Sequence, residues 1–496
     1  MLRKTRITLA AIFFLGIVWL FVDFTGLAHV WLGWMAKIQF LPAVLALNAG
    51  VVVGLAALTL ALGRVYCSVV CPLGVMQDLF AWMGRKSKKN RYCYSKPKNW
   101  LRYPILVLFV VLMLLGAGGI ATVIAPYSAF GRIAQSLLQP LWMWGNNLCA
   151  LAAERLDSYA FYSTDVWLRS LPVLITAVVT LVVLAVLAWR GGRTYCNTVC
   201  PVGTVLGFIS RFSLLKPVID ESKCNSCGLC ARNCKASCID PKTHSIDCSR
   251  CVACMDCMEK CRQGAISYRI GMKKRTRTEC TAKAAETVDK SRRAFVTGTV
   301  LALGTAAVEA QKIKVDGGLA AVEDKKVPKR KTRIVPPGSL SIENLSERCT
   351  GCQLCISECP NGVLRPSTSL QNFMQPEMSF ERGFCRPECN RCSQVCPAGA
   401  IRPISVEQKS STQIGHAVWV KANCVALLSD HPCGLCARKC PAGAIEMVAM
   451  TDKGREIMVP AVNEEKCIGC GKCENLCPAR PFSAIYVEGH EAHKEI

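Results

Sequence analysis

Residues 349–360 read CTGCQLCISECP, in which four cysteines follow the spacing C-x2-C-x2-C-x3-C and a proline comes next. With this spacing one tight loop supplies three thiolates to a [4Fe-4S] cluster, and the fourth thiolate serves elsewhere. The same spacing occurs three more times without deviation. The four regular blocks predict metal ligands at Cys224, Cys227, Cys230, Cys234, Cys251, Cys254, Cys257, Cys261, Cys349, Cys352, Cys355, Cys359, Cys467, Cys470, Cys473 and Cys477.

Two looser blocks differ in their first spacings but share the ending C-x2-C-x3-C-P. Together the six blocks predict six [4Fe-4S] clusters, which carry electrons one at a time. Five cysteines, at positions 93, 149, 238, 248 and 280, receive no role from spacing. The predicted ligands of the looser blocks are Cys385, Cys389, Cys392, Cys396, Cys424, Cys433, Cys436 and Cys440.

Other uses of so much cysteine are disfavoured. Disulfide scaffolds belong to short secreted chains, whereas this chain has 496 residues. Zinc sites pair two C-x2-C units or include histidine. The chain has only six histidines, and none stands at ligand spacing from a cysteine block.

The blocks at 224–234 and 251–261 are close neighbours and predict a two-cluster domain. In two-cluster ferredoxins the fourth cysteine of each block ligates the other cluster. This rule groups Cys224, Cys227 and Cys230 with Cys261, and it groups Cys251, Cys254 and Cys257 with Cys234. The proline that usually follows the fourth cysteine is replaced here by Lys235 and Arg262.

The first half of the chain contains four apolar stretches of the length that a bilayer requires, roughly 20 residues. They run from residue 7 to about 27, and over 41–62, 104–125 and 171–189. The net charge is +25, yet residues 349–496 hold 15 basic and 15 acidic residues, so the excess lies beside the apolar stretches. The positive-inside rule then places the N-terminus, the basic loop 85–102 and the first ferredoxin in the cytoplasm. This distribution indicates a membrane protein rather than a partner of nucleic acid.

A repeat marks the membrane half: GRVYCSVVCPLG at 63–74 recurs as GRTYCNTVCPVG at 192–203. Each copy follows an apolar stretch and contains a C-x3-C-P motif, whose cysteines share one helical face. We expect a cofactor-binding or redox site at Cys67, Cys71, Cys196 and Cys200. Three roles remain open: four ligands of one metal centre, two redox-active dithiols, or structural thiols.

An export signal is predicted inside the chain. Residues 291–296 read SRRAFV and precede a weakly apolar segment, as in twin-arginine signals for proteins exported after folding. The expected domains are a membrane domain at 1–216, a two-cluster domain at 217–270, a basic stretch with this motif and a candidate fifth span at 271–310, a linker at 311–340, and a four-cluster domain at 341–496. The predicted fold is therefore multidomain, joining a four-span α-helical membrane bundle to α+β bacterial-ferredoxin-like domains.

These features resemble two known families. Residues 1–270 are similar to NapH-type membrane ferredoxins, with four spans and two C-x3-C-P motifs before a two-cluster domain. Residues 291–496 are similar to NapG/MauM-type ferredoxins, with a twin-arginine leader before four blocks. The resemblance implies a fused quinol dehydrogenase component that feeds a periplasmic reductase, such as nitrate reductase. It also implies that the last four blocks pair first with fourth and second with third, so that Cys477 completes the set of Cys349.

The expected function is transfer of electrons from quinol, in the bacterial inner membrane, to a periplasmic acceptor protein. Lipid, the quinol pool and this acceptor are the expected partners, and quinone is an expected ligand besides the clusters. The N-terminus and first ferredoxin would be cytoplasmic, and the C-terminal domain periplasmic. Two alternatives remain: an accessory electron donor for maturation or reactivation of a metalloenzyme, and a protein whose cluster domains are all cytoplasmic, with 291–308 a short anchor.

Overall fold

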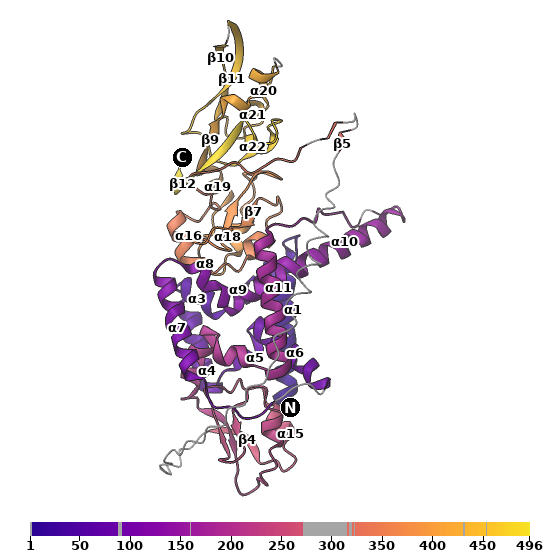
Figure 1. Cartoon of the computed structure of the whole chain (residues 1–496), viewed down its shortest axis with the longest axis vertical. Helices are drawn as coiled ribbons and strands as arrows, with labels where there is room; N and C mark the ends of the chain where they lie inside the picture. Colours follow the sequence, from indigo (N-terminus) through magenta and orange to yellow (C-terminus); the bar gives the residue numbers. More distant parts are fainter. Residues whose placement is uncertain are drawn as a thin grey trace, which may run out of the picture.

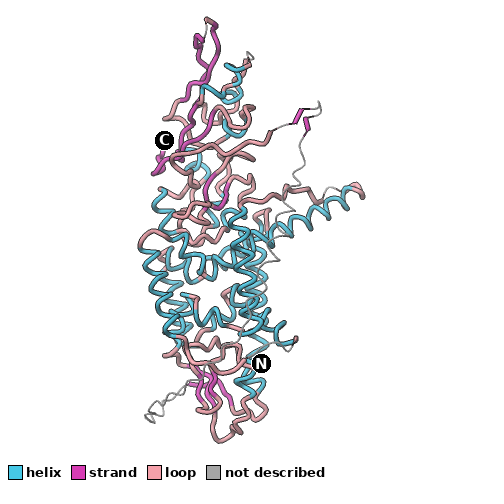
Figure 2. Tube along the Cα trace, in the orientation of Figure 1, coloured by secondary structure: helices cyan, strands magenta, loops and turns pink. Residues whose placement is uncertain are grey.

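The molecule is elongated, with a helical part between two parts built from loops and short strands (Figures 1 and 2). It is a computed structural model that describes residues 2–87, 92–158, 160–270, 315–316, 320–321, 323–429, 432–452 and 454–496. The part that contains the first ferredoxin lies at one end, beside the N-terminus, and residues 323–496 lie at the other end (Figure 1). The predicted twin-arginine motif lies outside the described residues.

Two helices of the described residues are long and apolar enough to cross a membrane. These are α1 (Leu2–Val22) and α11 (Leu171–Gly191), each of 21 residues. At 1.5 Å per residue each extends roughly 31 Å, which matches the apolar thickness of a bilayer. Two of the four predicted stretches therefore form continuous helices.

The other two predicted spans are interrupted. The stretch 41–62 forms α3 (Phe40–Leu45) and α4 (Ala49–Leu62), because Leu47 adopts a left-handed conformation with φ of 54° and the side chain of Asn48 caps α4. The stretch 104–125 forms α7 (Asn99–Leu114), α8 (Gly118–Ala121) and the 3-10 turn η1 (Thr122–Ile124), with a break at Gly116, whose φ is 74°. A bundle of four continuous spans is thus not what the described residues contain.

The two copies of the sequence repeat fold alike. In each copy a short helix holds the first cysteine, and a second helix begins at the proline of C-x3-C-P, a residue whose fixed φ suits the first helical position. The first copy forms α5 (Val65–Val69) and α6 (Pro72–Lys86), and the second forms α12 (Thr194–Thr198) and α13 (Pro201–Ser210). The remaining helices of this part are α2 (Leu27–Lys37), α9 (Pro126–Ile133), the π-helical turn η2 (Ala134–Leu138) and α10 (Gln139–Glu154).

The inner domain, defined as residues 215–270, has a two-stranded antiparallel sheet in which β1 (Leu215–Ile219) pairs with β4 (Ile266–Ile270). A second short pair joins β2 (Ile239–Asp240) to β3 (Ser245–Ile246). Each cysteine block leads into one short helix, either α14 (Leu229–Arg232) or α15 (Asp256–Lys260). Short strands and helices around two cysteine blocks agree with the expected α+β ferredoxin arrangement.

The outer domain, defined as residues 323–496, consists of paired strands and one-turn helices around the last four blocks. Its sheets pair β7 with β8, β9 with β12 and β10 with β11. Its elements are α16 (Ile342–Arg348), α17 (Leu354–Ser357), β7 (Leu364–Pro366), β8 (Pro376–Met378), α18 (Arg391–Val395), α19 (Val406–Ser411), β9 (Thr412–Trp419), η3 (Lys421–Asn423), α20 (Val425–Leu428), α21 (Leu435–Arg438), β10 (Ile445–Asp452), β11 (Arg455–Val462), α22 (Lys472–Leu476) and β12 (Ile485–Glu495); a separate short pair joins β5 (Val315–Asp316) to β6 (Ala320–Ala321).

The prediction of a linker over 311–340 is wrong for residues 323–340. Ile334 and Val335 are completely buried in the main hydrophobic core, and Arg330 forms an ion pair of 2.6 Å with Glu474. Residues 323–340 are therefore part of the outer domain. Their lysines, prolines and glycines gave no periodic apolar pattern, which is why the sequence suggested a linker.

The outer domain rests directly on α9. A Cβ atom added at Gly131 would lie 2.2 Å from the carbonyl oxygen of Cys352, a distance that no side chain tolerates. The hydroxyl of Ser128 also donates a hydrogen bond of 2.5 Å to the carbonyl oxygen of Thr350. Glycine at position 131 thus allows a cysteine loop to touch the helical part.

We predict that Gly131→Ala loosens this contact, because the added methyl group overpacks it at a cost of about 1–3 kcal/mol. Amide hydrogen exchange at residues 349–357 should become faster. Gly145→Ala is the matched control, since a Cβ atom at Gly145 meets nothing within 4 Å. Equal exchange in the two variants would contradict the docking described here.

Candidate iron–sulfur sites

The regular cysteine blocks share an unusual backbone. In each, the residues on both sides of the second cysteine have positive φ, between 49° and 75°. Such turns aim consecutive N–H groups at one point and form the concavities that bind anions, Fe–S clusters included. Side chains rarely tolerate this conformation, so its use outside glycine marks a functional constraint. The residues concerned are Ser226 and Gly228, Ala253 and Met255, Gly351 and Gln353, and Gly469 and Gly471.

A second recurring feature explains the Gly-Ala-Ile sequences behind several blocks. The N–H of Ala265 donates to the sulfur of Cys261 at 3.3 Å, and Ala444 donates to Cys440 at the same distance. The glycine before each alanine has a positive φ of about 60°, which turns the N–H toward the sulfur. A donor at a sulfur favours its anionic form, as a metal ligand requires.

In the inner domain the structure forms the two cysteine sets that the spacing predicted. The first set, with Cys224 and Cys261, lines one cavity together with two further cysteines of its block. The second set lines another cavity, and it includes Cys234 from the first block. The full sets are Cys224, Cys227, Cys230 and Cys261, and Cys234, Cys251, Cys254 and Cys257.

Cys238 was missed by the sequence reasoning. It is buried within the second cavity, and its sulfur lies 3.6 Å from that of Cys234. The C-x2-C-x2-C-x3-C spacing ends at Cys234, and Cys238 follows after three intervening residues. The spacing therefore gives no reason to count Cys238 as a ligand.

In the outer domain the pairing implied by family resemblance is wrong. Burial raises the pKa of the Cys352 thiol to about 11, and the adjacent Cys396 thiol contributes to the rise. Burial likewise raises the pKa of Cys392, with contributions from Cys385, Cys359 and Cys389. The first block thus pairs with the second. Each exchanges its fourth cysteine with the other, as in the inner domain.

The last two blocks form the other pair. Cys440 lines one cavity with Cys467, Cys470 and Cys473. Burial raises the pKa of Cys436 to about 11, and both Cys433 and Cys477 contribute. These blocks share a separate core that also contains Cys424. Neighbouring blocks therefore form local two-cluster units, and Cys477 lies apart from the core that holds Cys349.

The distances between side chains in each cysteine set favour an iron–sulfur cluster over a single metal ion. Among the described residues, no group of three or more His, Cys, Asp or Glu side chains converges closely enough to hold one metal ion. A zinc ion draws its sulfurs to about 2.3 Å from one point. A four-iron cube holds its thiolates further apart, so these sets, with their inward N–H groups, suit a [4Fe-4S] cluster. Bound clusters would supply one-electron redox chemistry.

The C-x3-C-P motifs of the two repeats come together at the inner end of the helical part. All four thiols are buried, and Cys200 lies close enough to Cys196, Cys71 and Cys67 to interact with them electrostatically. Each sulfur also has a donor. Arg64 reaches Cys67 at 3.7 Å, Arg193 reaches Cys196 at 3.8 Å, and the N–H groups of Gly203 and Gly74 point to Cys200 and Cys71.

The two arginines brace the repeats crosswise. Arg64 donates to the carbonyl oxygen of Cys196 at 3.2 Å, and Arg193 donates to that of Cys67 at 2.7 Å. Both guanidinium groups are completely buried. Arg193 pairs with Asp78 at 2.7 Å, but Arg64 has no carboxylate partner among the described residues. A buried cation without an anion is costly, and the four sulfurs are the groups placed to balance it.

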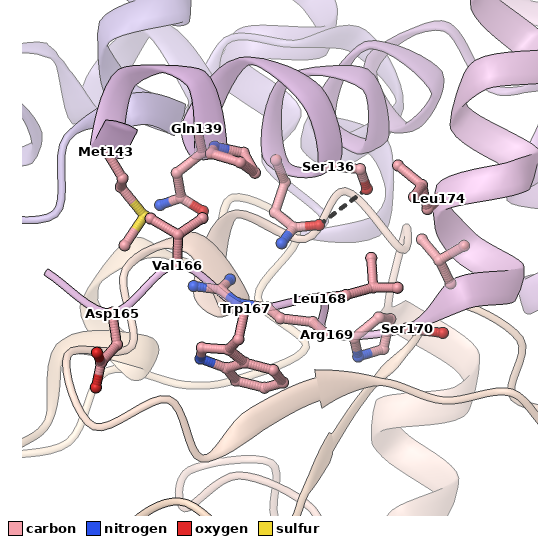
Figure 3. A pocket seen from close by; sticks show the side chains of 14 residues that line it. Ser136, Gln139, Met143, Asp165, Val166, Trp167, Leu168, Arg169, Ser170 and Leu174 are labelled. Carbon is pink, nitrogen blue, oxygen red and sulfur yellow. Dashed lines mark hydrogen bonds between the residues drawn. The ribbon is translucent and has the colours of Figure 1, made fainter. Parts of the chain in front are cut away.

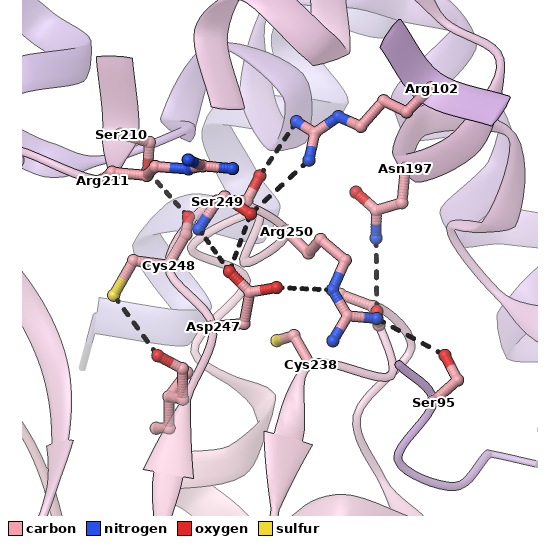
Figure 4. A network of polar contacts seen from close by, with 12 residues as sticks. Ser95, Arg102, Asn197, Ser210, Arg211, Cys238, Asp247, Cys248, Ser249 and Arg250 are labelled. Atoms are coloured by element: carbon pink, nitrogen blue, oxygen red, sulfur yellow. Dashed lines mark hydrogen bonds and ion pairs between the residues drawn. The ribbon is translucent and has the colours of Figure 1, made fainter. Parts of the chain in front are cut away.

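This thiol site touches the second cysteine set of the inner domain. Arg64 and Arg102 donate to the carbonyl oxygen of Ser249 at 3.1 and 3.2 Å, and Asn197 donates to that of Ala236 at 3.2 Å. Figure 4 shows the part of this network around Ser249, which lies between Arg102 and the Asp247–Arg250 ion pair. Ser249 and Ala236 stand two residues from Cys251 and Cys234, respectively.

Lys235, which replaces the usual proline, anchors the same contact. Its ammonium group lies 3.0 Å from Asp78 on α6 and 3.2 Å from Asp256 on α15. The lysine therefore joins the inner domain to the helical part, and its charge is balanced by two carboxylates.

At the other end, segment 165–170 holds the outer domain (Figure 3). Arg169 donates to the carbonyl oxygen of Ile356 at 2.6 Å. The indole of Trp167 stacks under Arg365 and Arg382 at 4.6 and 4.8 Å. Ile356 follows Cys355 directly, so both cluster domains contact the helical part through their cysteine loops.

Comparison with known proteins agrees with this chemistry. A family model described as a 4Fe-4S binding domain matches residues 45–90 and 171–218, and a 4Fe-4S dicluster domain matches 348–400 and 431–480. The chain is homologous to the NapH, NapG, NapF and MauM ferredoxin-type proteins. Its two parts are consistent with a fusion of NapH-type and NapG-type chains.

The chain is 32% identical over 172 residues to the ferredoxin-type protein NapH of Haemophilus influenzae, covering 34% of this chain and 47% of that protein. It is 29% identical over 179 residues to NapG of Escherichia coli, covering 33% and 77%. It is 30% identical over 159 residues to the methylamine utilization ferredoxin-type protein MauM of Methylorubrum extorquens, covering 29% and 66%. The chain thus spans about half of the NapH relative. No solved structure matches it.

The pairing of outer blocks can be tested by counting iron. Cys352→Ser with Cys396→Ser should remove one cluster, because both cysteines belong to one set. Cys352→Ser with Cys477→Ser should remove two, and the protein should lose twice as much iron and acid-labile sulfide. The reverse order of losses would restore the first-with-fourth pairing.

Proposed function

We propose that this chain carries electrons across a membrane, from quinol to an acceptor protein on the side of the outer domain. One observation carries the proposal: a single continuous core reaches from Cys254 of the inner domain, through the four C-x3-C-P cysteines, to Cys349, Cys352 and Cys355 of the outer domain. A packed path of this kind is what electron transfer between buried carriers needs.

Aromatic residues supply the middle of that path. Tyr66 and Tyr195 adjoin the C-x3-C-P thiols, and the hydroxyl of Tyr195 reaches the carbonyl oxygen of Ile124 at 2.5 Å. Phe21 lies 6.0 Å from Tyr127 and 6.1 Å from Phe130, between ring centres, beneath the outer cysteine loop. One core therefore connects Cys254 of the second inner set, the C-x3-C-P thiols and the first outer blocks.

The surface of the helical part supports its placement in a bilayer. Exposed tryptophans lie toward both ends of the helical part: Trp19, Trp31, Trp142 and Trp144 toward the outer end, and Trp82 and Trp100 toward the inner end, all 51–78% exposed. Helix α10 leaves the body at a large angle to α1 and α11, as a helix lying in the outer interface would (Figure 1). Amphipathic rings at this level are typical of the membrane boundary.

The charges support the direction of insertion. Basic residues of α1, α6 and α7 lie at the end that carries the inner domain, and the positive-inside rule makes that end cytoplasmic. The interrupted helices α3–α4 and α7–α8 complete the membrane part, since broken helices are tolerated where protein covers their ends. The outer domain is then periplasmic, and export through residues 291–296 would deliver it with its clusters assembled.

In this proposal the six cysteine sets hold six [4Fe-4S] clusters, and the C-x3-C-P cysteines hold a further electron carrier between them. The buried cation at Arg64, the four N–H donors and the position between the cluster domains support a redox cofactor over structural thiols. The acceptor binds the outer domain, and the homologues' Nap system suggests a partner in nitrate reduction.

The topology has a direct test. Alkaline phosphatase fused after Ile496 should be active, because it folds only outside the cytoplasm, and the same reporter fused after Ile270 should be inactive. Green fluorescent protein at these two positions should give the opposite result. An active phosphatase only at residue 270 would end the proposed orientation.

The central carrier also has a test. Replacing Cys67 and Cys196 together by serine should leave both cluster domains loaded with iron. Electrons from quinol should then reduce the cysteine sets on only one side of the C-x3-C-P site, as followed by electron paramagnetic resonance. Replacing Cys93 and Cys149, two exposed cysteines outside the core, is the control. Normal reduction of all sets in the first variant would reduce the C-x3-C-P thiols to a structural role.

A further inference from the structure

A groove between α1 and α6 has no role in the sites above. It is open to the surface of the helical part and, together with the open solvent at its mouth, measures about 1120 Å³. Its walls are apolar along α1, where Ile7, Ala11 and Leu15 are exposed, and Leu79 of α6 faces them. Since α1 is a candidate membrane span, these walls would meet lipid tails.

The inner end of the groove is polar. Arg6, Asp78, Lys235 and Asp256 line it, and they form the ion pairs that dock the inner domain. The buried Nε–H of Arg6 has no acceptor among the described residues. A donor without an acceptor at the end of an apolar groove suits a ligand with an apolar tail and an oxygen-bearing head.

The polar end also adjoins a redox site. Lys235 follows Cys234, and Asp256 stands between Cys254 and Cys257. All three cysteines belong to the second set of the inner domain. A head group bound beside Lys235 and Asp256 is thus one residue away from ligands of an electron carrier.

We propose that this groove binds the quinol that the chain oxidises, with the ring at the polar end and the isoprenoid tail along α1. The inference rests on the proposed function and gives it a location. The quinol becomes a quinone by losing two electrons and two protons. Cys234, Cys251, Cys254 and Cys257 would hold the oxidised cluster that accepts the two electrons one at a time, and water at the cytoplasmic mouth of the groove would take the two protons.

The walls fit a quinol better than a phospholipid. A phospholipid brings a phosphate anion, which would meet two carboxylates at the polar end. Four basic residues, Arg3, Arg6, Arg85 and Lys235, line the groove. Three of them are paired with Asp78 or Asp256, which leaves Arg85 alone without an ion pair among the described residues to attract a phosphate.

The test fills the groove without touching its ion pairs. Ala11→Phe places a ring in the apolar wall, and Ile12→Phe adds a similar ring on the same helix outside the lining. Binding of 2,3-dimethyl-1,4-naphthoquinone to the whole purified chain is measured by equilibrium dialysis. We expect Ala11→Phe to weaken binding at least tenfold and Ile12→Phe to change it less than twofold.

Two further arms separate the possible failures. Reduction by the corresponding naphthoquinol should slow at least tenfold in Ala11→Phe, whereas dithionite should reduce all variants equally. If the naphthoquinol reduces unaltered protein and Ala11→Phe at one rate, the groove is not the site although the proposed function stands. If it binds unaltered protein in the groove but reduces no cluster, quinol oxidation fails and the binding site stands. Displacement of the probe by phosphatidylglycerol vesicles, with no naphthoquinone-sensitive reduction, would make the groove a phospholipid site and overturn the inference.

Discussion

Negatively charged sulfur must be stabilised away from water at every site of this chain. A thiolate in an apolar interior is unfavourable unless donors, cations or a metal compensate it. In the cysteine loops, N–H groups turned inward by positive φ stabilise the sulfurs. In the C-x3-C-P site, two buried arginines stabilise them. One hydrophobic core then brings the second inner set, the C-x3-C-P site and the first outer blocks together.

The contacts between parts follow the same logic. Both cluster domains meet the helical part through the backbone of their cysteine loops, at Ser249 on one side and Thr350 on the other. Such contacts leave little freedom to move a cluster relative to its neighbour. The ion pairs of Lys235 strengthen one of them, and this explains why a cation stands where ferredoxins usually have proline.

Much of the site could be predicted because spacing along a chain reports local geometry. The inner pairing could be predicted from C-x2-C-x2-C-x3-C alone. The sequence repeat singled out Cys67, Cys71, Cys196 and Cys200 but left open whether they share one site. The outer pairing did not, because loops of different length separate the blocks and only packing decides which of them meet. The role of Arg64 was also hidden, although the repeat contains it, since burial is not visible in a sequence. The breaks at Leu47 and Gly116 were not predicted for a similar reason: both stretches are predominantly apolar, and mean hydropathy does not reveal a change in backbone conformation.

The crosswise brace of Arg64 and Arg193 has a consequence for biosynthesis. The carbonyl oxygen that satisfies Arg64 belongs to Cys196, which the ribosome adds 132 residues later. Until the second repeat emerges, the first therefore has a guanidinium with neither its acceptor nor its burial. Folding of the first repeat therefore stays incomplete during this part of translation, and this is the stage at which a chaperone would be needed.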